Sequence, residues 1–162
     1  LRFAAILAIV DSAFRMAWDP FAIKLFGQPD SEKQFSLIFS GYLAALFTLC
    51  TVISAFSGPL IHWVAGPDYK ESSRFVGYLT FGLLWIGSTN NLAAGNQWAK
   101  KTYWNGIGFS LGAMVTFILL YITAPIWGLL AAGVTFLVGS FVATTLILLT
   151  SQINHKINYK CY

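Results

Sequence analysis

The chain has 162 residues, of which 57% are hydrophobic and 10% are charged, and its mean hydropathy is +0.67. Soluble domains carry about 25% charged residues, so this composition excludes a water-soluble domain and predicts an integral membrane protein. In such a chain the net charge of +4 does not indicate a nucleic-acid-binding surface. The informative feature is the distribution of Lys and Arg among the loops, which predicts the orientation in the membrane.

The apolar segments predict an all-α fold, a polytopic membrane helix bundle of about five transmembrane helices, because a spanning helix needs about 20 mostly apolar residues. Helix-breaking residues mark the ends: Pro20, then Gly58-Pro59, then Pro125 and Gly128. The chain starts inside an apolar helix and stops without a clear end, so we expect a fragment of a longer protein. The predicted spans are 1–18, 35–57, 75–94, 103–121 and 128–150.

The first segment differs from the others because Asp11 and Arg15 lie well inside its apolar run, four residues apart. A charge at membrane depth costs roughly 2.5–3.5 kcal/mol on insertion scales, so it usually faces a partner or a water-filled cavity. The spacing places both side chains on one helix face, where they can pair. We therefore expect Asp11 and Arg15 to face a wet cavity.

The basic residues predict the orientation in the membrane. Alternation of five segments puts six lysines on one side, against Arg2, Lys70 and Arg74 on the other. The positive-inside rule places the six-lysine side in the cytoplasm, including the C-terminal tail, and tryptophans at segment ends agree with these boundaries. The six are Lys24, Lys33, Lys100, Lys101, Lys156 and Lys160.

Small residues recur in the last two segments, where Gly108 and Gly112 form a GxxxG pair and Gly139 follows in the next segment. Without a hydrophobic drive between helices in lipid, small residues let two backbones approach closely. The pattern therefore predicts a tightly packed bundle, and it carries no information about function.

Several short motifs follow one another in an order typical of one family. They are FRMAWDPF at 14–21, GPDYKES at 66–72, KKT at 100–102, PIWGLLAA at 125–132 and SQ at 151–152. In this order the chain resembles the C-terminal part of the polysaccharide flippases of the MOP superfamily, which export O-antigen and exopolysaccharide precursors. One departure is Leu130-Ala131, where the family often has Gly-Ala.

The resemblance implies a fold of two six-helix lobes around a central cationic cavity, to which this chain would supply helices eight to twelve. It implies a multi-pass protein of the bacterial inner membrane, with the Lys100-Lys101 linker in the cytoplasm. The implied activity is alternating-access export of oligosaccharide linked to undecaprenyl diphosphate, without covalent chemistry or a cofactor. The implied partners are that glycolipid, the bilayer and the polysaccharide polymerase machinery.

The anionic diphosphate of such a substrate would suit arginine, whose planar fork gives bidentate hydrogen bonds. Arg15, and Arg2 on the same helix, can provide such donors. Asp11 can hold Arg15 in the empty state or take part in ion coupling. The structural alternative is that Asp11 and Arg15 form a neutralised pair that locks two helices together.

The remaining candidates are also open to two interpretations. Asn90 and Asn91 can contact sugar hydroxyls, and interhelical hydrogen bonding explains them equally well. Lys100 and Lys101 are expected to fix topology by meeting anionic lipid headgroups, with capture of the diphosphate at the cytoplasmic mouth as the alternative.

Other functional classes fit the sequence less well. No nucleophile set, phosphate-binding loop or metal-spaced cluster can be assembled, so we expect no enzyme and no metal. Within transport, the alternative is a drug or cation antiporter of the same superfamily. A membrane enzyme that processes glycans would need catalytic residues in a large external loop, and the longest such loop, 57–74, is short. A membrane scaffold is disfavoured by the internal charges.

Overall fold

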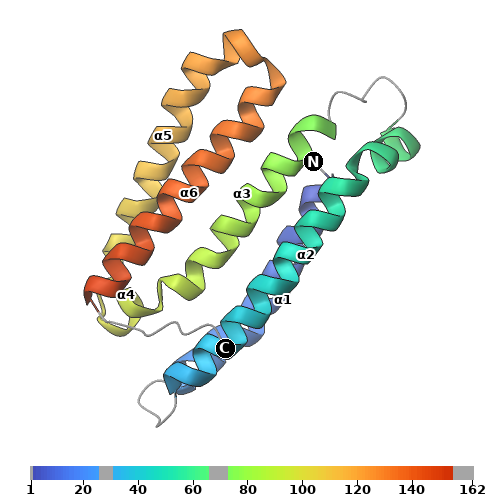
Figure 1. The fold of residues 1–162 in the computed structure, drawn as a ribbon. Coiled ribbons are helices and arrows are strands. Elements are labelled where there is room, and N and C mark those ends of the chain that lie inside the picture. Colours follow the sequence, from blue (N-terminus) through green and yellow to red (C-terminus); the bar gives the residue numbers. More distant parts are fainter. Residues whose placement is uncertain (1, 26–30, 66–72, 155–162) are drawn as a thin grey trace.

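The computed structural model describes residues 2–25, 31–65 and 73–154, and every regular element in these ranges is a helix. This confirms the predicted all-α class (Figure 1). The helices are α1 (Arg2–Leu25), α2 (Ser31–Ala65), α3 (Ser73–Leu92), α4 (Ala94–Trp98), α5 (Tyr103–Trp127) and α6 (Leu129–Asn154).

The helices form two antiparallel pairs with α3 between them. Helices α1 and α2 lie side by side, α5 packs along α6, and α3 contacts α1 and α2 on one side and α6 on the other (Figure 1). The short α4 closes one end, where it contacts α6. Because α3 is the shared neighbour, residues on its opposite faces belong to two different interfaces.

The prediction that prolines end the helices was wrong. Helix α1 continues past Pro20, α2 past Pro59 and α5 past Pro125. A proline removes one backbone hydrogen bond, whereas ending a helix inside lipid would leave several backbone groups without partners, so the helix continues. The chain turns instead at Gly128, whose φ of +52° lies in the region that glycine adopts without strain.

Residues 95–98, which lie between two of the predicted spans, belong to α4, and the buried side chain of Asn96 anchors this helix. The Asn96 Nδ2 group donates to Asn105 Oδ1 at 2.8 Å and to Thr150 Oγ1 at 3.1 Å. Its Oδ1 accepts from Asn154 Nδ2 at 2.9 Å. Asn96 therefore ties α4 to the start of α5 and the end of α6.

Replacing Asn96 by alanine is expected to lower the free energy of unfolding by about 1–3 kcal/mol, because the partner groups lose a buried contact. Thermal unfolding of the protein in detergent checks this. Gln97→Ala is the matched control, since Gln97 is exposed on the same short helix. Equal unfolding temperatures for the two variants would contradict a structural role for Asn96.

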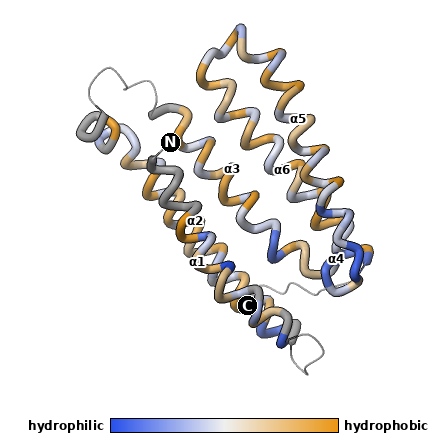
Figure 2. The backbone as a smooth tube through the Cα atoms, turned by 180° about the vertical axis from the view of Figure 1, so that it is seen from behind, coloured by the Kyte–Doolittle hydropathy of each residue, from blue (hydrophilic) through white to orange (hydrophobic). Residues whose placement is uncertain are grey.

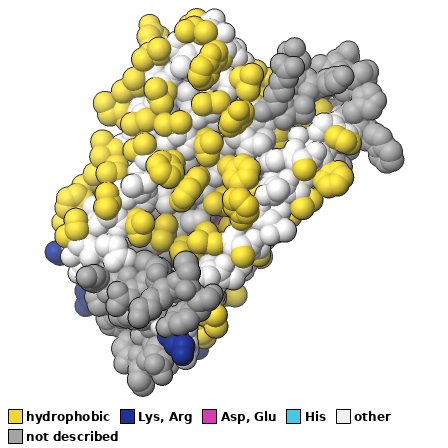
Figure 3. Space-filling model, viewed as in Figure 1, with side chains coloured by type: hydrophobic (Ala, Val, Ile, Leu, Met, Phe, Trp, Pro, Cys, Tyr) yellow, Lys and Arg dark blue, Asp and Glu magenta, His cyan; other side chains and the backbone are white. Residues whose placement is uncertain are grey.

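The outer surface is apolar, the core between α1, α2 and α3 is built from large apolar side chains such as Trp18 and Phe35, and small and hydroxyl side chains are buried along α6. The helix α5 exposes 75% of Phe117, 82% of Tyr121 and 75% of Ile126, and apolar side chains spread over the face drawn in Figure 3. Inside, the hydroxyl of Thr144 donates to the Trp85 carbonyl of α3 at 3.0 Å. Polar groups with internal partners and bulky apolar groups outside are the arrangement expected in lipid.

Among the described residues, three helical stretches are long and apolar enough to cross a membrane: Lys33–Pro59, Tyr103–Trp127 and Leu129–Asn154. They correspond to three of the five predicted spans. The other two predicted spans form most of α1 and α3, where Asp11, Arg15, Asn90 and Asn91 lower the hydropathy. The membrane bundle is therefore confirmed, and spanning by α1 and α3 stays a prediction.

The predicted close packing of small residues is confirmed between α5 and α6. A Cβ atom added to Gly112 would lie 2.7 Å from the Gly139 carbonyl oxygen and 2.6 Å from Ala143 Cβ. A Cβ at Gly108 would lie 2.5 Å from Ile147 Cγ1. The two backbones approach closely because these positions lack side chains.

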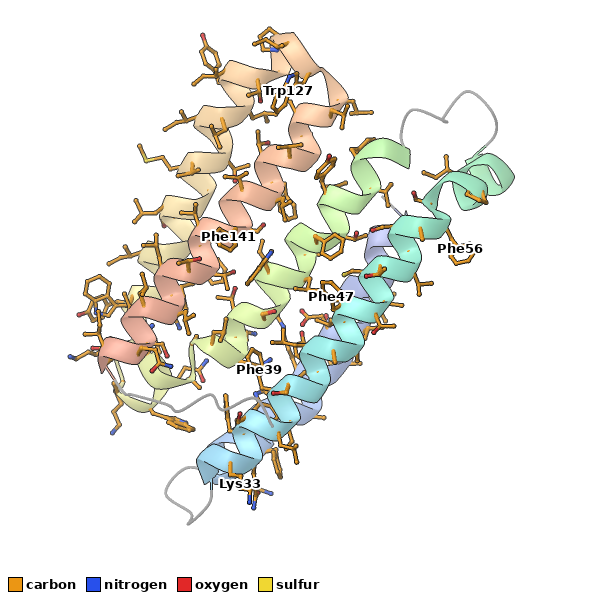
Figure 4. The ribbon with its side chains drawn as sticks, in the orientation of Figure 1. Lys33, Phe39, Phe47, Phe56, Trp127 and Phe141 are labelled. Atoms are coloured by element: carbon orange, nitrogen blue, oxygen red, sulfur yellow. The ribbon has the colours of Figure 1, made fainter. Side chains whose placement is uncertain are left out.

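The described lysines share one end of the bundle. The end of α1, the start of α2 and the α4–α5 junction meet there, and they carry Lys24, Lys33, Lys100 and Lys101 (Figure 1). The hydrophilic segments in Figure 2 are most prominent near this end. Lys33 and Trp127 lie at opposite ends of the molecule (Figure 4). This clustering agrees with the side to which the sequence analysis assigned them.

Candidate functional site

The candidate site starts from the ion pair that the sequence spacing predicts. Arg15 Nη2 lies 2.6 Å from Asp11 Oδ2 on the same face of α1, and the two side chains are 31% and 16% exposed, respectively. A rise of 1.5 Å per residue puts about 14 Å of helix on one side of Asp11 and about 21 Å on the other. The pair thus lies in the middle third of α1, away from both ends.

Helix α2 contributes Tyr42 to the pair. The Tyr42 hydroxyl donates a hydrogen bond to Asp11 Oδ1, and the Tyr42 side chain is 7% exposed. Its ring stacks on Phe14 of α1, with centroids 4.0 Å apart. The carboxylate of Asp11 is therefore divided between two donors, with one oxygen for Arg15 and the other for Tyr42.

Helix α3 contributes Asn90. With its amide oxygen toward Arg15, Asn90 accepts from Arg15 Nη1 at 2.7 Å and Nε at 3.3 Å. The opposite orientation would set an NH₂ group against N–H donors, so the hydrogen bonds decide the assignment. We call Asp11, Arg15, Tyr42 and Asn90 the polar cluster; it joins α1, α2 and α3.

Gly87 of α3 leaves the space that the cluster occupies. A Cβ atom added there would lie 3.0 Å from Asp11 Oδ1 and 3.3 Å from the Tyr42 hydroxyl oxygen. Such distances are too short for ordinary carbon–oxygen contacts. An alanine at position 87 would therefore push Asp11 or Tyr42 away by a few tenths of an ångström, so the close approach of α3 to the carboxylate favours glycine.

A cavity of about 190 Å³ borders the cluster between α1, α2 and α3. Asp11, Ser12 and Arg15 form its polar wall, and the rest is lined by Leu46, Leu83, Leu84, Ile86 and Gly87. A hollow of this size with one charged wall and apolar walls has room for a small polar or anionic group, and it is smaller than the roughly 300–1,000 Å³ of a site for a drug-sized ligand. The geometry agrees with the expectation that Asp11 and Arg15 face a cavity.

Some other predicted site residues lie away from this cavity. Arg2 begins α1, its side chain lies outside the described part, and helix geometry sets its Cα about 20 Å from that of Arg15. Lys101 at the α4–α5 junction donates to Asn154 Oδ1 at 3.1 Å, and Lys100 is exposed with a φ of +56°. The two lysines therefore belong to the α4 end of the bundle.

Asn91 neighbours Asn90 in sequence but is in a different environment. Its side chain is 2% exposed, and its Oδ1 atom has no hydrogen-bond partner among the described residues. Asn90, in contrast, makes an interhelical contact with Arg15, as one of the two interpretations of the sequence expected. The sequence analysis treated the two asparagines together, but only Asn90 belongs to the polar cluster, and Asn91 is a buried amide outside it.

Sequence reasoning missed Tyr42, Gly87 and Ser12. Tyr42 and Gly87 lie on helices other than α1, and their sequence distance from Asp11 conceals the contact. One usable signal was a tyrosine hydroxyl inside an otherwise apolar span, because a buried hydroxyl in lipid needs an acceptor. Nothing in the sequence distinguishes Gly87 from the other glycines of α3.

A second hollow of about 390 Å³ lies between α3, α5 and α6. Its lining includes two hydroxyl side chains, Thr116 and Ser140, and both donate to carbonyls of their own helix, at 3.0 and 2.6 Å. The remaining lining is apolar or glycine. Within the described ranges, no group of three or more His, Cys, Asp or Glu is placed to hold a metal. The polar cluster is therefore the candidate site.

Comparison of the chain with models of protein families, with curated proteins and with solved structures finds no match. The membrane bundle follows from composition and structure, and an activity has to be argued from the site. The charged wall of the cavity between α1, α2 and α3 is the observation on which that argument depends.

Proposed function

We propose that the chain forms part of a flippase that moves a lipid-linked oligosaccharide across the membrane by alternating access. The supporting observation is the Asp11–Arg15 pair, which lies midway along α1 and borders a cavity. Charged groups at this depth are costly, and they commonly mark substrate or ion pathways. A chain that needed only helix packing would use the small and hydroxyl residues seen elsewhere in the bundle.

The chemistry of Arg15 suits the diphosphate of such a substrate. A guanidinium has five N–H donors in a rigid fork, and the contacts with Asp11 and Asn90 involve its Nη2, Nη1 and Nε atoms. Within the described part of the chain, the second hydrogens on Nη1 and Nη2 have no protein partner, so a ligand can use them. An anionic group entering the cavity would use these donors and compete with Asp11 for the guanidinium.

The apolar walls of the cavity and the lysines at one end of the bundle also support this proposal. The apolar walls of the cavity, including Leu46 and Leu83, suit the lipid part of an amphipathic substrate. The lysine-bearing end would face the cytoplasm and the anionic headgroups there. In this proposal Lys100 and Lys101 act in orientation, while Arg15 acts in binding.

A drug or cation antiporter is the second candidate, and one observation favours it. Asp11 is an ionisable carboxylate at membrane depth with a hydroxyl partner, a type of group that takes part in proton and cation pathways. The close ion pair with Arg15 makes this less favourable, because a bound cation would meet the guanidinium.

The test is a rescue assay in a bacterial strain that lacks its O-antigen flippase. The protein containing this chain is expected to restore surface glycan, and Arg15→Ala is expected to reduce restoration at least about tenfold, as for loss of a charged hydrogen bond. Arg15→Lys keeps the charge but loses the planar fork, and it should give an intermediate value.

Met16→Ala is the matched control, because Met16 is the next residue on α1 and is 81% exposed. All variants are compared at equal membrane abundance. Rescue by Arg15→Ala equal to that of Met16→Ala would reduce Arg15 to a structural residue. Absence of rescue by the parent protein, together with drug resistance that depends on Asp11, would favour the antiporter.

A further inference from the structure

The two oxygens of Asp11 have different partners on different helices. Oδ2 lies 2.6 Å from Arg15 Nη2 of α1, and Oδ1 accepts from the Tyr42 hydroxyl of α2. Tyr42 is held in place by its own packing, since it is 7% exposed and stacks on Phe14. Its hydroxyl therefore stays directed at Asp11 whether or not Arg15 remains paired with Asp11.

We propose that Tyr42 is a positioning residue that compensates the Asp11 carboxylate when an anionic group occupies Arg15. The inference rests on the proposed function, because it concerns the moment at which a diphosphate takes the guanidinium. A largely buried carboxylate that loses its cation is strongly unfavourable unless hydrogen-bond donors replace it. Tyr42 supplies such a donor from α2 without moving, and so lowers the cost of binding at Arg15.

This assignment predicts where the loss of the hydroxyl is felt. Tyr42→Phe removes a hydrogen bond that is already present in the empty state, but its loss costs more in the anion-bound state, where Asp11 no longer has Arg15 as its partner. The affinity for an anion should therefore weaken by about threefold to tenfold, less than the full effect of removing a hydrogen bond to an uncompensated charge. With Asp11→Asn there is no charge to compensate, so Tyr42→Phe should change the affinity by less than about twofold.

The measurement uses a thiol placed in the cavity wall of the protein containing this chain. Ser12→Cys lines the same cavity as Asp11 and Arg15. Cys161 is replaced by serine, while Cys50, which is 0% exposed, stays. Purified protein is treated with a water-soluble thiol reagent at increasing concentrations of inorganic diphosphate. The measured quantity is the diphosphate concentration that halves the labelling rate. It is compared among four proteins that all carry Ser12→Cys: the parent, Tyr42→Phe, Asp11→Asn and the variant with both changes.

The proposal expects protection in the parent and a rise of about threefold to tenfold in the half-protecting concentration for Tyr42→Phe. It expects almost no further rise when the same change is made in Asp11→Asn. An equal effect of Tyr42→Phe in both backgrounds, or none in either, overturns the role of Tyr42 and leaves the proposed function intact. Labelling of the parent without protection by diphosphate overturns both.

A variant that fails to fold would not end the test. Phenylalanine preserves the ring that stacks on Phe14, and thermal unfolding reports whether the fold is kept. If Tyr42→Phe unfolds, Gly87→Ala tests the same contact from α3, because its Cβ atom would crowd Asp11 Oδ1 at 3.0 Å and the Tyr42 hydroxyl at 3.3 Å. The same dependence on Asp11 is then expected, and an effect independent of Asp11 overturns the proposal.

Discussion

A single methyl group added at Gly112 is expected to lower the free energy of unfolding by about 1–3 kcal/mol, the usual cost of overpacking. In Gly112→Ala the new Cβ atom would lie 2.7 Å from the Gly139 carbonyl oxygen and 2.6 Å from Ala143 Cβ. One of these neighbours is backbone and cannot rotate away, so α5 and α6 must separate. Thermal unfolding in detergent, monitored by circular dichroism, measures the change.

Gly106→Ala is the control, because Gly106 lies in the same helix and has no atom within 4 Å of an added Cβ. There the methyl group meets open space, and the better helix propensity of alanine gives a gain of up to about 1 kcal/mol. The two changes, identical in chemistry, should thus have opposite signs. A similar change in stability at both positions would show that the α5–α6 contact does not control the result.

Removing the charge of Asp11 alone is expected to be more harmful than removing both charges of the pair. In Asp11→Ala, Arg15 and the Tyr42 hydroxyl both lose the carboxylate as a partner midway along α1, and Arg15 keeps only Asn90. Because Arg15 is 31% exposed, we expect a loss of about 2 kcal/mol, less than the 3–5 kcal/mol typical of a fully buried pair. Unfolding in detergent and abundance in the membrane measure this loss.

The double variant Asp11→Asn/Arg15→Gln keeps polar shapes without charge, so its stability should lie within about 1 kcal/mol of the parent. Its glycan export, measured in the rescue assay, should nevertheless be lost, because the guanidinium is gone. Stability and export therefore separate in this variant. Full export by the double variant would contradict any binding role for Arg15.

Much of the fold could be predicted because membrane chains follow few rules. Uninterrupted apolar runs predicted the helices, since a backbone in lipid has to satisfy its own hydrogen bonds. Spacing along one helix predicted the Asp11–Arg15 contact, and small residues at 108, 112 and 139 predicted close packing. Each of these signals is local, or depends on residue size alone.

The rest of the site could not be predicted because it depends on contacts between helices. Tyr42 meets Asp11, and Gly87 leaves room for both, only once the rotations of α1, α2 and α3 about their axes are fixed. A rotation of one residue turns a helix by about 100° and would point Tyr42 elsewhere. The proline errors have a different cause, since rules from water-soluble helices underestimate how strongly lipid favours an unbroken helix.

The close contact between α5 and α6, with apolar side chains on their outer faces, has a consequence for how this sequence can vary. Phe117 and Ile126 are each 75% exposed, so any apolar residue there would meet lipid tails equally well. Gly112 and Gly139, enclosed between α5 and α6, admit no substitute with a side chain. Tolerance to substitution on α5 and α6 should therefore depend on residue volume at the enclosed positions and on hydrophobicity at the exposed ones, whereas a water-soluble protein requires hydrophobic residues inside and tolerates polar residues outside.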